Sequence, residues 1–298
     1  MASRGVASYN EPDRKPPSKK SMPTRFVQGF RELLTEALAA TDPASGKKLG
    51  SCIGVYAFYD YDGEPIYVGQ TWENFGTRIG RHLRGQRSDT LAYRILDPFE
   101  VADMELFPVE ELRKDVDKKR KLDAIEYSVY LKAIGDSKYR AILNEKIPPI
   151  SSPVELPKSH RFTLVPSDMR EDRDHPDVRI ARRAETLARV AAVAHERGEV
   201  SAGLRRVIVI QAVRLADLAA ARLAYAEGRT RPSPAAIDVI ALVGNVMIEF
   251  QDGADEDEGE GPSPKAASVD VVHDGRSVSV EFDSEHNEAP RFVDVDEL

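Results

Sequence analysis

The sequence predicts an α/β (α+β) domain over about residues 50–150, followed by an all-α region and an acidic tail. Two apolar and aromatic runs flank an Asp-Gly pair in GVYAFYDYDGEPIYVGQT, a pattern typical of a β-hairpin. Segments with helical spacing precede and follow this hairpin. Beyond the proline-rich stretch KIPPISSPVELPKSH, long alanine-rich helical segments follow. The chain of 298 residues, 41% of them hydrophobic, is long enough for one large or two ordinary domains.

The first 49 residues are expected to hold a disordered basic arm and one helix. Residues 1–24 are rich in Pro, Ser and Lys and have few large apolar side chains, a composition that disfavours a packed core. From Arg25 onward apolar residues recur at helical spacing, and TDPASGKKLG then ends the helix. Residues 25–49 are therefore predicted to form a helix and a loop that lead into the first strand.

The domain at 50–150 is predicted to contain a hairpin, a helix, a strand and a second helix. Asp62 and Gly63 form the hairpin turn because both residue types tolerate positive φ. Apolar and polar residues roughly alternate in the third predicted strand, and apolar residues recur on one face of the last helix. The elements expected are strands at 52–59 and 64–69, a helix within NFGTRIGRHLRGQ, a strand at 101–109 and a helix at 122–134.

The second half of the chain is predicted to be a linker, a helical bundle and a tail. Four prolines indicate a linker within 151–176. Three helical segments, at 178–197, 203–227 and 235–250, are expected to pack as a bundle over 177–250, whose wide apolar face offers a contact for a homodimer. The acidic tail, 251–298, contains SVDVVHDGRSVSVEFD, which predicts one hairpin.

The charge is unevenly divided along the chain. The net charge is −8, but residues 252–298 hold 15 acidic and 3 basic residues, which leaves 39 basic and 35 acidic residues before them. A mildly basic body with an acidic tail is consistent with nucleic-acid contact. The single cysteine, Cys52, excludes an intramolecular disulfide, and the sequence shows neither a secretory h-region nor an apolar run of about 20 residues. We therefore expect a cytoplasmic protein with no membrane partner.

A set of polar and aromatic residues in this domain is similar to a known catalytic pattern. The pattern begins with Gly54-Val55-Tyr56 and, after ten intervening residues, Tyr67-Val68-Gly69, and it continues with Arg78, His82, Glu126 and Asn144. Over about residues 50–148 the order resembles the GIY-YIG nuclease family, with valines in place of the two isoleucines that name it. Alone, each tyrosine would be read as an ordinary cross-strand aromatic residue. The joint order and spacing favour the nuclease interpretation.

The resemblance implies a small three-stranded antiparallel sheet flanked by helices, and metal-dependent hydrolysis of DNA phosphodiester bonds. It implies that Arg78 stabilises developing negative charge and that His82 acts as general base, directly or through Tyr56. Which of Tyr56, Tyr67 and His82 receives the proton of the attacking water is left open. Because Arg78 and His82 are four residues apart, they share one face of a helix, and a guanidinium can hold two phosphate oxygens.

The metal and the supporting residues follow from the same comparison. Glu126 is an acid within an otherwise apolar helix, and a carboxylate is a hard oxygen ligand that suits Mg²⁺ or Mn²⁺. By resemblance, Asn144 supports the site near the phosphate. No small-molecule cofactor is indicated. A basic stretch beside the Glu126 helix predicts contacts to the DNA backbone. The predicted DNA-binding residues are Arg81, Arg84, Lys118, Lys119, Arg120 and Lys121.

Two alternatives to a DNA endonuclease stay open at this point. One is a noncatalytic nucleic-acid-binding or assembly module that retains the fold, and the other is an RNA nuclease. Within the family, restriction or phage defence is the expected role, because the sequence shows neither zinc-finger spacing nor an additional nuclease domain.

Overall fold

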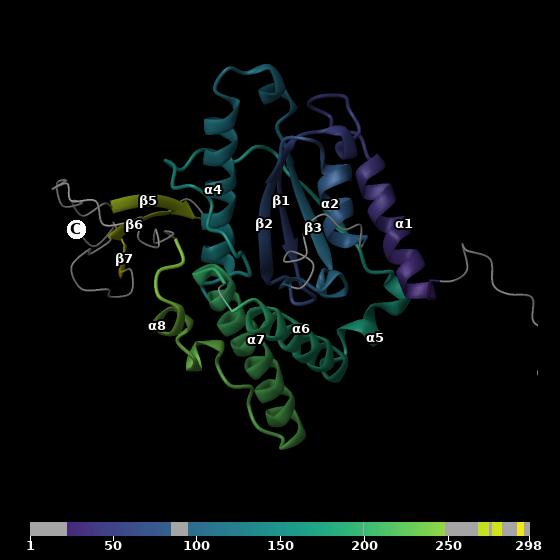
Figure 1. The fold of residues 1–298 in the computed structure, drawn as a ribbon, viewed down its shortest axis with the longest axis vertical. Coiled ribbons are helices and arrows are strands. Elements are labelled where there is room, and N and C mark those ends of the chain that lie inside the picture. The colour runs from purple at the N-terminus through teal and green to yellow at the C-terminus, as the bar shows by residue number, and fades with distance from the viewer. Residues whose placement is uncertain are drawn as a thin grey trace, which may run out of the picture.

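The computed structural model describes residues 23–84, 95–198 and 200–247, together with strands at 268–273, 276–281 and 291–294. Figure 1 shows a sheet between helices, with a further group of helices below it. The predicted basic arm lies almost entirely outside the described residues, as does the acidic run at 252–267. Among the described helices, none combines the length and the apolar character that a membrane span requires.

A four-stranded antiparallel sheet forms the centre of the fold. Its strands are β1 (Gly54–Tyr59), β2 (Pro65–Thr71), β3 (Asp103–Pro108) and β4 (His160–Thr163), in the order β2-β1-β3-β4. Every residue of β1 is buried, so both faces of this central strand are covered. The predicted α/β class is confirmed. The sheet has one strand more than the resemblance implies, because β4 pairs with β3.

Three helices pack around the hairpin of β1 and β2. These are α1 (Arg25–Ala39), α2 (Phe75–Leu83) and α4 (Lys118–Asp136). Figure 1 shows α4 beside β2, with α1 and α2 on the side of the sheet toward β3. Apolar side chains of α1 at helical spacing, Phe26, Phe30 and Leu34, join the common core. The hairpin is therefore held between helices that arise before and after it in the sequence.

The segment predicted as a linker at 151–176 contains structure of its own. It contributes β4 and, after a 3₁₀ turn, the short helix α5 (Arg170–Asp174). The side chains of β4 alternate between half-buried and exposed, as in an edge strand with one face on the core. Four residues in a proline-rich setting are too few for a clear period-two signal, and pairing with β3 makes them a strand.

The helical region is built on one long antiparallel pair. Helix α6 (Pro176–Arg197) packs against α7 (Ala202–Ala226), and Arg222 near the end of α7 binds Asp177 at the start of α6. The third predicted helix is much shorter than 235–250. Within this span as far as residue 247, where the description stops, α8 (Val239–Val243) is the one α-helix, preceded by the 3₁₀ turn Pro234–Ala236 and ended by Gly244 at φ +71°.

The acidic tail holds three strands in a sheet of their own. Strands β5 (Ser268–His273), β6 (Arg276–Glu281) and β7 (Arg291–Asp294) are antiparallel and lie in the order β5-β6-β7. The first two correspond to the hairpin that the sequence predicts around Asp274-Gly275.

Candidate active site

The two glycines of the motif are required by close packing around the hairpin. A Cβ atom at Gly69 would lie 2.6 Å from Tyr56 Oη and 3.0 Å from Tyr67 Cε1. A Cβ atom at Gly54 would lie 2.1 Å from the carbonyl oxygen of Phe107 on β3. Each glycine therefore allows a close approach that any other residue would block. The tyrosines can pack tightly because Tyr56 lies directly opposite Gly69 in the β1–β2 register.

An aromatic cluster joins the hairpin to α2. Tyr56 Oη and His82 Nε2 are 2.9 Å apart, within hydrogen-bond distance. The Tyr67 ring lies 6.2 Å from the Tyr56 ring and 5.7 Å from the imidazole, measured between centroids. Phe58, two residues after Tyr56, stacks on Tyr67 at 6.0 Å. The structure thus brings together both predicted tyrosines and the predicted histidine.

Helix α2 presents Arg78 and His82 one turn apart. Asn74 caps the helix, since its side-chain oxygen accepts a hydrogen bond from the Thr77 amide at 2.7 Å. Burial raises the pKa of Tyr56 well above its ordinary value, and Tyr67 acts in the same direction, whereas the guanidinium of Arg78 opposes the rise. Tyr56 is therefore a neutral phenol at physiological pH, with the Arg78 cation close enough to act on it.

Glu126 is buried on α4, where it adjoins Gln70 of β2. Gln70 Nε2 donates a hydrogen bond to Asp123 Oδ1 at 2.7 Å, and the Gln70 side chain also hydrogen-bonds Glu126. Burial raises the pKa of Glu126 to about 7. The hydrogen bond from Gln70 and the charge of Arg78 act against this rise, and the negative charge of Asp123 adds to it. Glu126 and Arg78 are therefore electrostatically coupled, as one shared site requires.

These residues fit a divalent cation held largely by substrate and water. The Glu126 carboxylate is held close to the like charge of Asp123, an arrangement that a bound cation would stabilise. Gln70 Oε1 is a buried oxygen without a hydrogen-bond partner. Among the described residues, His, Cys, Asp and Glu form no group of three or more that could enclose a metal ion. Mg²⁺ commonly keeps several waters, so one carboxylate can suffice.

Two members of this site, Gln70 and Asp123, are absent from the sequence prediction. Gln70 directly follows the Tyr-Val-Gly triplet, and Asp123 precedes Glu126 by three residues. Residues three apart on a helix lie on neighbouring positions of one face. The three-residue spacing between Asp123 and Glu126 could therefore have predicted that Asp123 lies beside Glu126 in the site.

Asn144 is hydrogen-bonded to the backbone of strand β2. Its Oδ1 atom accepts a hydrogen bond from the Val68 amide at 3.0 Å, and its Nδ2 atom donates to the Val68 carbonyl oxygen at 2.8 Å. The Leu143 amide also donates to the Ile66 carbonyl oxygen, at 2.8 Å. Asn144 thus pairs with the free edge of β2, beside Tyr67, as a neighbouring strand would.

The predicted DNA-binding residues fall into two groups. Arg81 on α2 and Arg84 directly after it are engaged within the protein, since Arg81 pairs with Glu73 and Arg84 Nη2 donates to Thr35 Oγ1 at 2.8 Å. The four on α4, at 118–121, are exposed in its first turn. Lys121 Nζ binds Asp115 at 2.6 Å and Arg120 Nη2 lies 3.6 Å from Asp117.

An open hollow of about 420 Å³ lies beside the basic turn of α4. Asp123 lies in its wall, next to Gln70 and Glu126. Val116 and Ile150, which are 97% and 57% exposed, form part of its rim. The lining residues are Val116, Asp117, Lys119, Arg120, Asp123, Pro149, Ile150 and Ser151. Lys119 and Arg120 thus line the same hollow as Asp123.

Comparison with protein families matches a span from the hairpin into the first part of α4. Residues 52–128 match the family model of the GIY-YIG catalytic domain, a span that includes Tyr56, Tyr67, Arg78, His82 and Glu126. Asn144 lies beyond this span. Neither a curated protein nor a solved structure matches the chain. The match confirms, over residues 52–128, the resemblance to the GIY-YIG nuclease family that the motif indicates.

Proposed function

We propose that the chain is a metal-dependent endonuclease that hydrolyses phosphodiester bonds of DNA. The observation that carries the proposal is the 2.9 Å contact between Tyr56 Oη and His82 Nε2, with Arg78 and Glu126 coupled to the same site. A phosphodiesterase needs a base for the attacking water and positive charge beside the phosphate oxygens. His82 and Arg78 are residue types that suit these two roles, which supports the proposal.

In the reaction, His82 is the general base and Tyr56 orients it. Tyr56 is completely buried, whereas His82 and Tyr67 are partly exposed, so water bound with the substrate can reach the imidazole more readily. With His82 Nε2–H donating to the neutral Tyr56 oxygen, the Nδ1 atom is unprotonated and takes the proton of the attacking water. The guanidinium of Arg78 stabilises the negative charge that develops on the phosphate oxygens.

Glu126 would hold Mg²⁺ or Mn²⁺, assisted by the oxygens of Gln70 and Asp123. When bound, this cation would supply positive charge to the phosphate and to the leaving oxygen. Lys118, Lys119, Arg120 and Lys121 would contact the DNA backbone, since they are exposed beside the hollow that opens at Asp123.

A plasmid assay tests the catalytic part of the proposal. Purified wild type, Glu126→Gln and the matched control Asp136→Asn, which changes an acid at the far end of the same helix, are incubated with supercoiled plasmid in Mg²⁺ or EDTA. We expect nicking or cutting by wild type and Asp136→Asn only with Mg²⁺, and none by Glu126→Gln. If wild type binds DNA without cutting it, the noncatalytic alternative replaces the proposal. Preferential cutting of a matched RNA duplex would support an RNA nuclease instead.

The role of Tyr56 is tested by comparing two variants. Removal of a general base lowers rates by about 10²–10⁴-fold. We expect His82→Ala to fall in this range and Tyr56→Phe to lose much less, since Tyr56 only orients the imidazole. Equal losses would instead indicate that the proton passes through Tyr56.

Restriction or phage defence is the biological role that we propose. A host expressing wild type should reduce phage plating, whereas one expressing Glu126→Gln should not. A homodimer through 177–250 would place two active sites on opposite strands, and the exposed apolar side chains of Leu223, Tyr225 and Leu242 support such a contact. Light scattering that shows a monomer, both free and on DNA, would exclude the dimer.

A further inference from the structure

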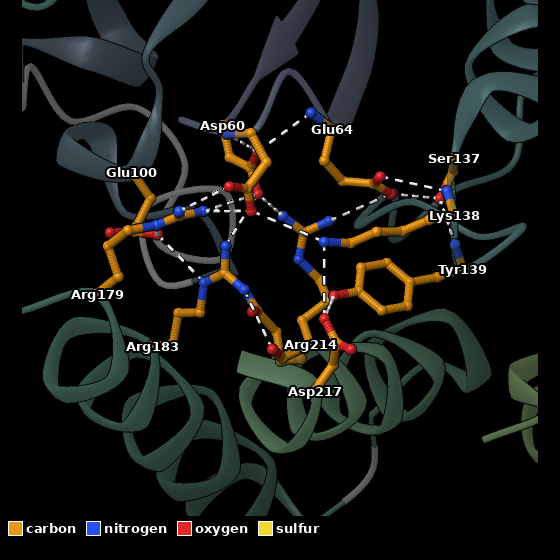
Figure 2. Close-up of polar contacts among 12 residues, drawn as sticks. Asp60, Glu64, Glu100, Ser137, Lys138, Tyr139, Arg179, Arg183, Arg214 and Asp217 are labelled. Atoms are coloured by element: carbon orange, nitrogen blue, oxygen red, sulfur yellow. Dashed lines mark hydrogen bonds and ion pairs between the residues drawn. The ribbon is translucent and has the colours of Figure 1, made fainter. Parts of the chain in front are cut away.

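A buried ion cluster joins the β1–β2 turn to helices α6 and α7 (Figure 2). Asp60 directly follows β1, and its Oδ2 atom accepts hydrogen bonds from Arg183 Nη2 at 2.9 Å and Arg214 Nη2 at 2.8 Å. Arg179 Nη2 lies 3.4 Å from the same oxygen. Figure 2 shows the three arginines reaching up from the two helices toward this single carboxylate.

All four of these charged residues are buried. Asp60 is 1% exposed, and Arg179, Arg183 and Arg214 are 2%, 4% and 2% exposed. Further carboxylates balance the arginines, among them Glu100, whose Oε2 atom accepts from Arg183 Nε at 3.2 Å. A buried ion network adds little stability compared with apolar packing of the same size, but each charge must meet its partner. Its consequence is therefore one defined position of the helices against the turn.

Asp60 also shapes the turn that connects the two tyrosine strands. Its second oxygen, Oδ1, accepts hydrogen bonds from the amides of Asp62 at 2.9 Å and Glu64 at 3.1 Å. The turn determines the strand register, which places Phe58 opposite Tyr67 and has an irregularity just after Phe58. Since side chains alternate between faces, a slip by one residue would carry Tyr67 to the opposite face of the sheet. The Asp60 carboxylate thus binds both the amides of the turn and the arginines of α6 and α7.

A second arm of the cluster reaches the end of α4, the helix that carries the site carboxylate. Glu64, in the same turn, accepts hydrogen bonds from Ser137 Oγ at 2.5 Å and from the Lys138 amide at 3.2 Å. Two residues after Ser137, Tyr139 Oη donates to Asp217 Oδ2 of α7 at 2.8 Å. The hairpin, which carries Tyr56 and Tyr67, and α4, which carries Glu126, are therefore both linked to α7.

We propose that the α6–α7 pair is a positioning element of the active site and that Asp60 is the positioning residue through which it holds the tyrosine hairpin. The inference rests on the proposed nuclease function for its activity measurement. It extends the catalytic unit beyond the family match at 52–128 to the end of α7 at Ala226. The helical region then sets active-site geometry, in addition to any role in DNA choice or assembly.

The test removes the charge of Asp60 while keeping its size. In Asp60→Asn, the amide oxygen can still accept the turn hydrogen bonds, but an NH₂ group faces the three guanidinium groups. The matched control, Asp177→Asn, breaks the exposed ion pair between the same two helices. Activity is measured at a temperature where circular dichroism shows each variant folded. We expect kcat of Asp60→Asn to fall at least tenfold with KM for DNA within twofold, and the control to equal wild type.

A second measurement separates positioning from mere stability. The His82 imidazole is followed by NMR as pH is varied, with His82→Ala to assign the signal. We expect the His82 titration to move in Asp60→Asn, because Tyr56 no longer holds Nε2. Unchanged kcat and an unchanged titration in the folded variant would overturn the inference.

Two further outcomes are also decisive. If Asp60→Asn does not fold, Arg183→Lys, which keeps the charge and loses the guanidinium fork, takes its place with the same expectations and the same overturning result. If the wild type cuts no DNA, the nuclease proposal fails, while the His82 titration still decides whether the helices position the hairpin.

Discussion

Replacing Asn144 by alanine should destabilise the fold before it affects any contact with substrate. The side chain is 5% exposed and satisfies both backbone groups of Val68. Its removal leaves a buried amide and a buried carbonyl unpaired, each at about 1–3 kcal/mol, so we expect a loss of about 2–6 kcal/mol. With a urea m-value of about 3 kcal/mol/M, this corresponds to a decrease of roughly 0.7–2 M in the unfolding midpoint.

Urea unfolding followed by circular dichroism gives this measurement. The control is Asn245→Ala, which removes one hydrogen bond, to the Met247 amide at 2.8 Å, in a half-buried turn. We expect its cost to stay near 1 kcal/mol, the net value of one hydrogen bond. If Asn144→Ala unfolds at the wild-type midpoint and yet loses DNA cleavage, the backbone role is wrong, and Asn144 acts on the substrate as the family resemblance implies.

Three further predictions concern the hairpin, the first strand and the basic turn. Gly69→Ala should displace Tyr56 and lower both the cleavage rate and the melting temperature. The control Gly80→Ala, whose new Cβ would meet no neighbouring residue within 4 Å, should gain up to about 1 kcal/mol of stability. An unchanged cleavage rate and melting temperature in Gly69→Ala would refute the packing argument. Although burial opposes it, the hydrogen bond from Arg113 lowers the pKa of Glu110 from 4.5 to about 2. The resulting stabilisation is complete above pH 4.5 and is lost as pH falls toward 2. The difference in urea midpoint between wild type and Glu110→Gln should therefore shrink over that interval. In fluorescence anisotropy, Lys119→Gln should make the slope of log affinity against log salt concentration shallower by about 0.9. The control Lys132→Gln should leave the slope unchanged, because Lys132 already pairs with Asp136 on the same helix. Equal slopes for Lys119→Gln and wild type would show that Lys119 does not contact DNA.

Local patterns were sufficient for the hairpin and its neighbours. The Asp62-Gly63 turn, the helix around Arg78 and the helix around Glu126 are set by contacts close in sequence, and the structure has a turn or helix at each. Strand β4 depends on pairing with β3 across more than fifty residues, and nothing local distinguishes it. The third predicted helix reduces to α8 because Pro234 and Gly244 interrupt an otherwise helical pattern.

The site was predictable where a residue type dictates the chemistry. Tyr56 and His82 meet as the motif implies. The position of Asn144 was not predictable, because an amide can pair with a phosphate or with a peptide group equally well, and only the course of the chain past β2 decides. The burial of Arg179, Arg183 and Arg214 was not predictable either. Arg214, for example, lies in a helix whose sequence is that of an ordinary bundle helix, with nothing local to mark this arginine as buried.

The long separation between Asp60 and its partners has a consequence for the order of events during synthesis. Arg214 follows Asp60 by 154 residues, which a ribosome adds in roughly 8–30 s at 5–20 residues per second. Until then the Asp60 carboxylate lacks its full set of cations and is best left in water, because burying an unpaired charge is costly. The hairpin can form early, but the Asp60 carboxylate in its turn can be buried with all its arginine partners only when α7 has been made. Completion of the nuclease is thereby linked to translation of its helical region.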